Sequence, residues 1–116
     1  KDLSRDVVYV KDVAHAFYKA IKSERTYGLY NMTSGKGVTL QEQAEVIAEL
    51  FAQSPEKKSK IIYKPEIQNN TPSYLFSMAK AKRDFDFEPA FGDFKVMMSD
   101  YKKDLDAHKF QDLFKY

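Results

Sequence analysis

The chain of 116 residues contains no cysteine. This absence excludes disulfide scaffolding, thiol catalysis and zinc-thiolate sites, and it is compatible with the reducing cytoplasm, where we expect the protein to reside. No apolar run approaches the roughly 20 residues that span a bilayer. Because residues 1–4 lead directly into an expected strand, we also expect no signal peptide and no membrane partner.

Glycine is scarce, with four in the whole chain. None of them has the spacing of the glycine-rich turn that binds a dinucleotide. Residues 34–37 (SGKG) match a phosphate-binding loop only in part, since the first glycine and the final Ser or Thr of that motif are missing. His15 and His108 stand apart, without acidic partners at ligand spacing. The sequence therefore predicts neither a cofactor site nor a metal site within this chain.

A strong charge of one sign is also missing, because 19 basic and 17 acidic residues leave a net charge of +2. Such a balance gives little reason to expect nucleic acid as a partner. The basic stretch Lys57–Lys60 is typical of a solvated loop. Weak nucleic-acid binding through this stretch is kept as one alternative.

The residues that are present indicate a folded α/β protein. Hydrophobic residues make up 43% and aromatic residues 15% of the chain, as in globular proteins, and the length suits a single domain. Apolar runs predict about three short strands, over residues 7–10, 28–32 and 61–63. Amphipathic patterns predict about four helices, over residues 13–23, 40–53, 78–85 and from 93 onward. Three strands are too few for a complete dinucleotide-binding sheet, so we expect a small lobe.

Two of the predicted helices have recognisable starts. Asp12 precedes the first helix and is predicted to cap it. Thr39 and Glu42 form a capping-box pattern at the start of the second. The predicted inner face of the first helix consists of Val13, Ala14, Phe17 and Ile21.

Arg5 stands at the start of the predicted strand over residues 7–10, which leads into a helix. A guanidinium group on a fixed backbone suits a phosphate group, because it can donate to two oxygens at once. The alternative is that Arg5 forms an ion pair with Asp6 or another carboxylate and only holds the strand in place.

Four segments resemble, in order and spacing, the NAD-dependent epimerases and dehydratases of nucleotide sugars. These enzymes belong to the extended short-chain dehydrogenase/reductase family. The matching segments cover most of residues 4–90 and are 5–14 (RDVVYVKDVA), 28–39 (GLYNMTSGKGVT), 61–65 (IIYKP) and 79–89 (AKAKRDFDFEP).

The resemblance implies that residues 1–116 form the single C-terminal, substrate-binding domain of a Rossmann-type enzyme. The N-terminal domain that binds NAD(P) would lie outside this chain. Arg5 matches the position that contacts the nucleotide diphosphate, and Tyr74 a position near the hexose pocket, with membership of the core as the alternative for Tyr74. Asn70 stands where the family has an acidic residue of the substrate site, and Ile67 replaces a second phosphate-binding arginine.

The resemblance also implies that the catalytic residues lie elsewhere. The family's Tyr-x-x-x-Lys pair, in which the lysine helps the tyrosine to act as a base, comes far upstream of the arginine motif. Tyr18 and Lys22 have this spacing but follow Arg5, so we interpret them as a chance pair on a helix. We expect the isolated chain to be inactive, and the parent enzyme to be an isomerase or oxidoreductase that acts on a nucleotide sugar.

A further alternative is a non-catalytic module derived from this lobe, which binds a ligand or a protein. The changes at Ile67 and Asn70 favour it. A lobe without its companion domain would also expose apolar surface, so we expect that the chain can self-associate as a homo-oligomer.

Overall fold

The computed structural model describes residues 3–64 and 72–111. Over these residues the protein is a small mixed α/β fold with four α-helices, one short 3₁₀ helix and a two-stranded sheet, so the predicted α/β class is confirmed. In chain order the elements are β1 (Ser4–Asp6), α1 (Val10–Lys22), β2 (Gly37–Thr39), α2 (Leu40–Leu50), the 3₁₀ helix (Pro55–Lys57), α3 (Ala79–Phe85) and α4 (Phe94–Asp106).

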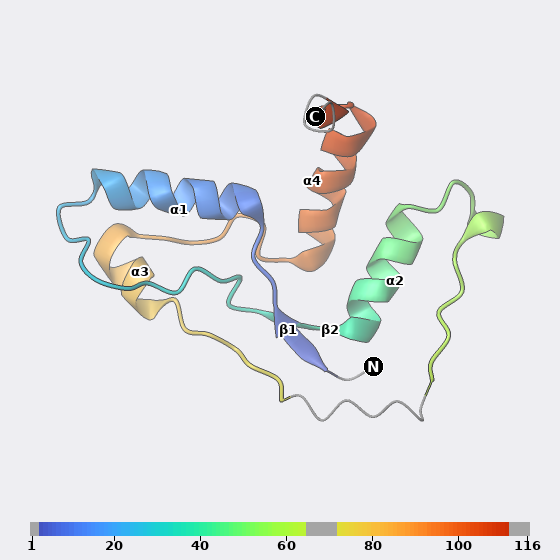
Figure 1. Ribbon diagram of the computed structural model, residues 1–116, viewed down its shortest axis with the longest axis horizontal. Helices are drawn as coiled ribbons and strands as arrows, with labels where there is room; N and C mark the ends of the chain where they lie inside the picture. The colour runs from blue at the N-terminus through green and yellow to red at the C-terminus, as the bar shows by residue number, and fades with distance from the viewer. Residues whose placement is uncertain (1–2, 65–71, 112–116) are drawn as a thin grey trace.

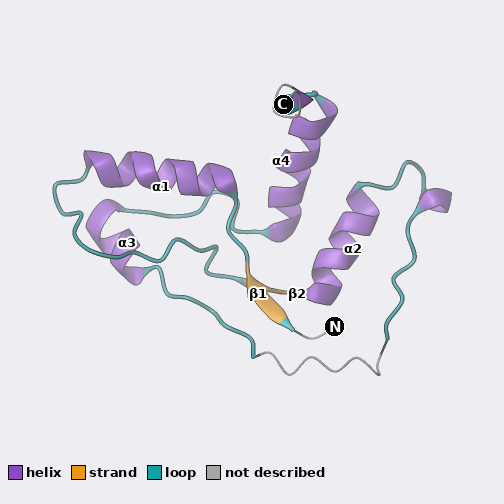
Figure 2. Cartoon of the chain, in the orientation of Figure 1, coloured by secondary structure: helices purple, strands orange, loops and turns teal. Residues whose placement is uncertain are grey.

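The helices form two pairs. α1 packs against α3, and α2 packs against α4. Figure 1 shows the first pair on one side of the molecule and the second on the other, with β1 and β2 between them. Irregular segments make the connections between many of these elements (Figure 2). The small sheet therefore lies where the two helix pairs meet.

β1 and β2 pair antiparallel, with Arg5 opposite Val38. The predicted strand over residues 7–10 is wrong. The chain leaves the sheet after Asp6, and Val10 is already the first residue of α1. The strand thus ends where its partner ends, because a strand persists only while a neighbour pairs with its backbone.

The predicted strands over residues 28–32 and 61–63 are wrong for the same reason, since no neighbouring strand pairs with either run within the part of the chain that the structure describes. Instead of a strand, a lysine side chain provides hydrogen bonds to backbone carbonyl groups in and just before the first run. The Lys80 ammonium donates to the carbonyl oxygens of Tyr27 and Leu29, at 2.7 Å and 2.9 Å. Sequence reasoning did not assign this role to Lys80.

α1 begins earlier than predicted, and Asp12 is not its cap. Tyr9 occupies the N-cap position with extended backbone and no capping side-chain hydrogen bond. Asp12 lies in the first turn, where the helix dipole favours a carboxylate, and it is buried. Its two oxygens accept from the backbone N–H groups of Ala90 and Phe91, at 2.8 Å and 3.0 Å. Asp12 therefore joins α1 to the segment that precedes α4.

The buried face of α1 also differs from the predicted one. Ala16 is fully buried in a cluster with Ala81 of α3, whereas Phe17 and Ile21 are 57% and 83% exposed. Two helices approach most closely where their side chains are small, which explains why the alanines face inward. The predicted inner face is therefore largely exposed.

The apolar core is small and lies between α1, α3 and the chain that follows α3. Ala16, Ala81, Phe85 and Phe87 form its buried cluster. Tyr30 packs against it, with its ring edge-on to Phe85 at a centroid distance of 5.0 Å. Such a core stabilises α1 against α3 and leaves Phe17 and Ile21 of α1 exposed.

The predicted capping box of α2 is confirmed. Thr39 Oγ1 accepts from the Glu42 N–H at 3.1 Å, and the Glu42 carboxylate accepts from the Thr39 N–H at 2.7 Å. The last predicted helix is confirmed as α4, capped by Asp93, whose carboxylate accepts from the Val96 N–H at 3.0 Å. No helix among the described residues is long and apolar enough to cross a membrane.

A large surface remains exposed. The accessible surface of the chain is 9027 Å², whereas a compact monomer of 13.5 kDa exposes about 6,500 Å². The radius of gyration is 17.2 Å, against about 13 Å for a compact chain of this length. The chain thus exposes roughly 2,500 Å² more than a compact monomer does.

Candidate functional site

Arg5 lies in β1 and is partly buried. Its guanidinium Nη1 donates to the carbonyl oxygen of Pro72 at 3.2 Å. Within residues 3–64 and 72–111, no carboxylate forms an ion pair with Arg5, so the alternative of an ion pair with Asp6 is wrong. A guanidinium with five N–H donors has donors left beyond this single bond.

Residues 72–76 run alongside β1. Ser73 Oγ accepts from the Ser4 N–H at 3.0 Å, and the bond from Arg5 to the Pro72 carbonyl lies next to it. Further along, the Phe76 N–H donates to the Asp6 carboxylate at 3.3 Å. These contacts bring the segment that carries Tyr74 next to the strand that carries Arg5.

Tyr74 is not part of the core. Its side chain is 58% exposed, and Leu75 and Phe76 are exposed as well, so the core alternative is wrong. The rings of Tyr74 and Phe76 stack at a centroid distance of 6.5 Å, with an angle of 27° between their planes. Exposed paired rings present flat apolar faces to solvent, which is the surface that a sugar or a base can stack on.

The other two positions singled out by the resemblance, Asn70 and Ile67, lie outside the described residues. Their place relative to Arg5 and Tyr74 stays a prediction.

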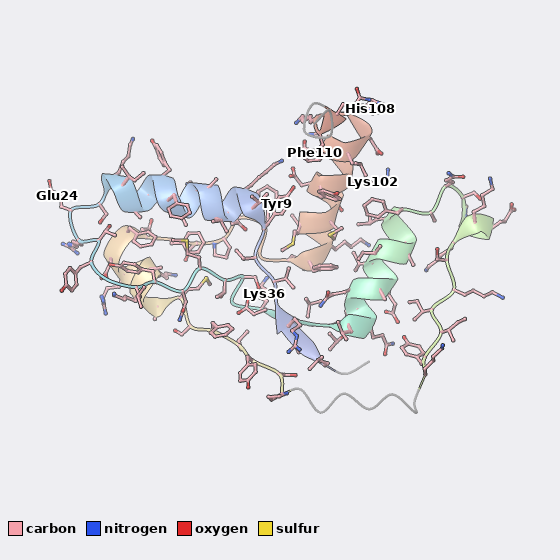
Figure 3. The ribbon with its side chains drawn as sticks, viewed as in Figure 1. Tyr9, Glu24, Lys36, Lys102, His108 and Phe110 are labelled. Carbon is pink, nitrogen blue, oxygen red and sulfur yellow. The ribbon has the colours of Figure 1, made fainter. Side chains whose placement is uncertain are left out.

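A hollow of about 600 Å³ adjoins the aromatic pair. Phe76 forms part of its wall, and the loop before β2 forms another part through Ser34 and Lys36. Figure 3 labels Lys36 on this loop. The volume of the hollow lies within the range of small-molecule sites. Lys82, which also lines the hollow, forms an ion pair with Glu88.

Sequence reasoning missed Asp6 as a member of this site. Its Oδ1 accepts from both the backbone N–H and the hydroxyl group of Ser34, each at 2.9 Å. Its Oδ2 accepts from the Phe76 N–H. One carboxylate therefore joins β1, the loop before β2 and the aromatic segment. The available signal was its place directly after Arg5 in the RD pair.

A charged network joins the start of α1 to α4. Tyr9 donates to Asp100 at 2.8 Å, and Lys11 forms ion pairs with Asp100 and Asp104. Lys109 pairs with Asp104 at 2.6 Å. Figure 3 shows Tyr9 at the end of α1 that faces α4.

This network moves pKa values away from neutrality. Hydrogen bonds from Lys109 and Lys11 lower the pKa of Asp104 to about 2. Burial and the hydrogen bond to Asp100 raise the pKa of Tyr9 to about 12. A general acid or base works best with a pKa near the working pH. The network therefore suits attachment of α4 rather than proton transfer.

Tyr18 and Lys22 contact each other on the exposed side of α1. The Lys22 ammonium donates to the Tyr18 hydroxyl and lies 4.4 Å from the ring centroid. Both residues are exposed.

No group of three His, Asp or Glu side chains among the described residues is arranged to hold a metal ion.

Comparison with known proteins leaves the function to be argued from this geometry. No protein-family model and no curated protein matches the chain. The site that the structure offers is the surface formed by β1 and the aromatic segment. The 600 Å³ hollow meets this surface at Phe76, and neither Arg5 nor Tyr74 lines it.

Proposed function

We propose that the chain is the substrate-binding lobe of an NAD(P)-dependent epimerase or dehydratase that acts on nucleotide sugars. The observation that carries the proposal is the adjacency of Arg5 and the Tyr74 segment. Arg5 and Tyr74 are 69 positions apart in the sequence, yet three hydrogen bonds between residues 4–6 and residues 72–76 hold the two segments together.

The two side chains supply complementary chemistry for such a substrate. A guanidinium group binds a diphosphate through paired, charge-assisted hydrogen bonds and stays protonated at every working pH. The exposed ring of Tyr74 offers an apolar face for the hexose and one hydroxyl group for hydrogen bonding. The adjoining hollow is large enough for part of a ligand of this size.

The parent enzyme would bind NAD(P) in another domain, since this chain has no glycine-rich turn for a dinucleotide. Bound in that domain, NAD(P)⁺ would supply a hydride acceptor for the oxidation of a sugar hydroxyl. The residues of this lobe bind and orient the nucleotide sugar for that chemistry.

The exposed face of α1 supports docking to a companion domain. Val10, Ala14, Phe17 and Ile21 recur at helical spacing and are all exposed. The centre of a protein–protein interface is richer in apolar side chains than its rim, as this stripe is. We propose the cofactor-binding domain as the partner that covers this face.

Arg5→Ala tests the binding function. The 116-residue chain is titrated with a set of nucleoside diphosphate hexoses by calorimetry, and the variant is expected to bind at least about 10-fold more weakly, because a hydrogen bond to a charged group is lost. Arg25→Ala removes an exposed arginine outside the site and serves as the matched control. Equal affinities of the two variants, or no binding by the wild type at millimolar ligand, would contradict the proposal.

A double variant, Phe17→Ser with Ile21→Ser, tests the docking face. Because both side chains are exposed, we expect an unchanged melting temperature and weaker self-association in sedimentation experiments. Tyr27→Ser changes an exposed aromatic side chain outside the stripe and is the control. A wild type that neither self-associates nor binds a hydrophobic dye would argue against a docking face. A specific dimer that the double variant dissociates would make a second copy the occupant.

The non-catalytic module remains the second candidate, and the exposed α1 face favours it equally. The calorimetry separates the two candidates. Binding of a nucleotide sugar that depends on Arg5 supports the enzyme lobe, whereas the module predicts no such dependence.

A further inference from the structure

We propose that Asp6 is the positioning residue of the candidate site, which fixes the Tyr74–Phe76 segment and the loop before β2 against the strand that carries Arg5. This inference deepens the proposed function and rests on it for the identity of the ligand. The geometry of Asp6 does not depend on the identity of the ligand, because its bonds to Ser34 and Phe76 lie within the chain.

The carboxylate of Asp6 divides its two oxygens between two segments. Oδ1 takes both contacts from Ser34, and Oδ2 takes the contact from the Phe76 N–H. The neighbouring Arg5 donates to the Pro72 carbonyl oxygen and forms no ion pair with Asp6, so Asp6 accepts from neutral N–H and O–H donors here. Hydrogen bonds to an ionised acceptor are the stronger kind.

The aromatic segment depends on such ties, since it lies outside every helix and strand. At its start, Pro72 and Ser73 are bonded to β1. At its end, beyond Tyr74, the bond to β1 is the one from Phe76 to Asp6. Tyr74 is therefore held from both sides. Loss of the Asp6 contact would free the segment that carries the two stacked rings.

Asp6→Asn separates the two connections. An asparagine keeps one acceptor oxygen, which the two Ser34 donors favour, and places an NH₂ group, which cannot accept, toward the Phe76 N–H. Ser34→Ala is the matched control, because it removes a contact to Oδ1 and leaves the Phe76 bond in place.

Amide hydrogen exchange of the 116-residue chain, followed by NMR, measures the connection directly. In Asp6→Asn we expect exchange at Phe76 to accelerate at least about 10-fold, with unchanged protection at Ala16 and Ala81 in the helices. In Ser34→Ala, exchange at Phe76 is expected to stay as in the wild type. Unchanged exchange at Phe76 in Asp6→Asn would overturn the proposal. So would a loss of protection throughout α1 and α3, because it would show a general role in folding.

A double-mutant cycle with Asp6→Asn and Tyr74→Ala, titrated with a uridine diphosphate hexose, tests the functional consequence. If Asp6 acts through the aromatic segment, the double variant loses no more affinity than the weaker-binding single variant. Additive losses would show independent roles and overturn the inference. If Arg5→Ala weakens binding and Asp6→Asn does not, positioning fails while the binding function stands. If Arg5→Ala has no effect, the binding function fails, and the exchange experiment still decides the role of Asp6.

Discussion

Replacing Asp12 by alanine removes two hydrogen-bond acceptors from the interior. The side chain is 1% exposed, and its oxygens accept from the N–H groups of Ala90 and Phe91. A buried donor left without a partner costs about 1–3 kcal/mol. Because Ala90 is an exposed residue, water replaces part of the loss. We therefore expect a decrease of about 2–3 kcal/mol in the free energy of unfolding, a large share of the roughly 5–15 kcal/mol of a small domain.

Urea unfolding followed by circular dichroism measures this change. Asp12→Asn keeps one acceptor oxygen and is expected to lose less than Asp12→Ala. Asp106→Ala is the control, because Asp106 lies on the exposed surface of α4 and pairs with Lys102 one turn away, a kind of pair that contributes about 0–1 kcal/mol. If Asp12→Ala destabilises the protein no more than Asp106→Ala does, Asp12 does not join α1 to the chain before α4.

Three further predictions concern other parts of the fold. Hydrogen bonds from Lys109 and Lys11 lower the pKa of Asp104 from 3.8 to about 2. The stability that the ionised carboxylate contributes is therefore present above about pH 4 and is lost as the pH falls toward 2. Asp104→Asn should flatten that part of the curve of unfolding free energy against pH in acid titrations. Thr39→Ala breaks the capping box and should lower the free energy of unfolding by about 1 kcal/mol in urea titrations. A decrease no larger than that of a surface variant would refute this. Gly35 has a φ of +68°, and a Cβ there would lie 2.7 Å from Met78 Cε; Gly35→Ala should lower the melting temperature, and an unchanged value would contradict this strain.

Part of the candidate site could be predicted from the sequence. Arg5 and Tyr74 were singled out by the motifs in which they occur, and their adjacency follows from contacts between residues far apart in the chain. Asp6 was missed because its function depends on partners 28 and 70 residues away. A carboxylate next to an arginine suggests an ion pair, and only the fold shows that its oxygens face Ser34 and Phe76 instead.

The sequence by itself determined the features that depend on neighbouring residues. The capping box at Thr39 and the approximate ranges of the four α-helices follow from local hydrogen bonding and periodicity, although α1 begins three residues earlier than predicted. The tertiary structure decided which extended runs became strands, because pairing needs a partner from elsewhere in the chain. It also decided which face of α1 is buried. An apolar stripe predicts contact with some surface, but close packing of Ala16 with α3 directed Phe17 and Ile21 outward, toward the partner that we propose.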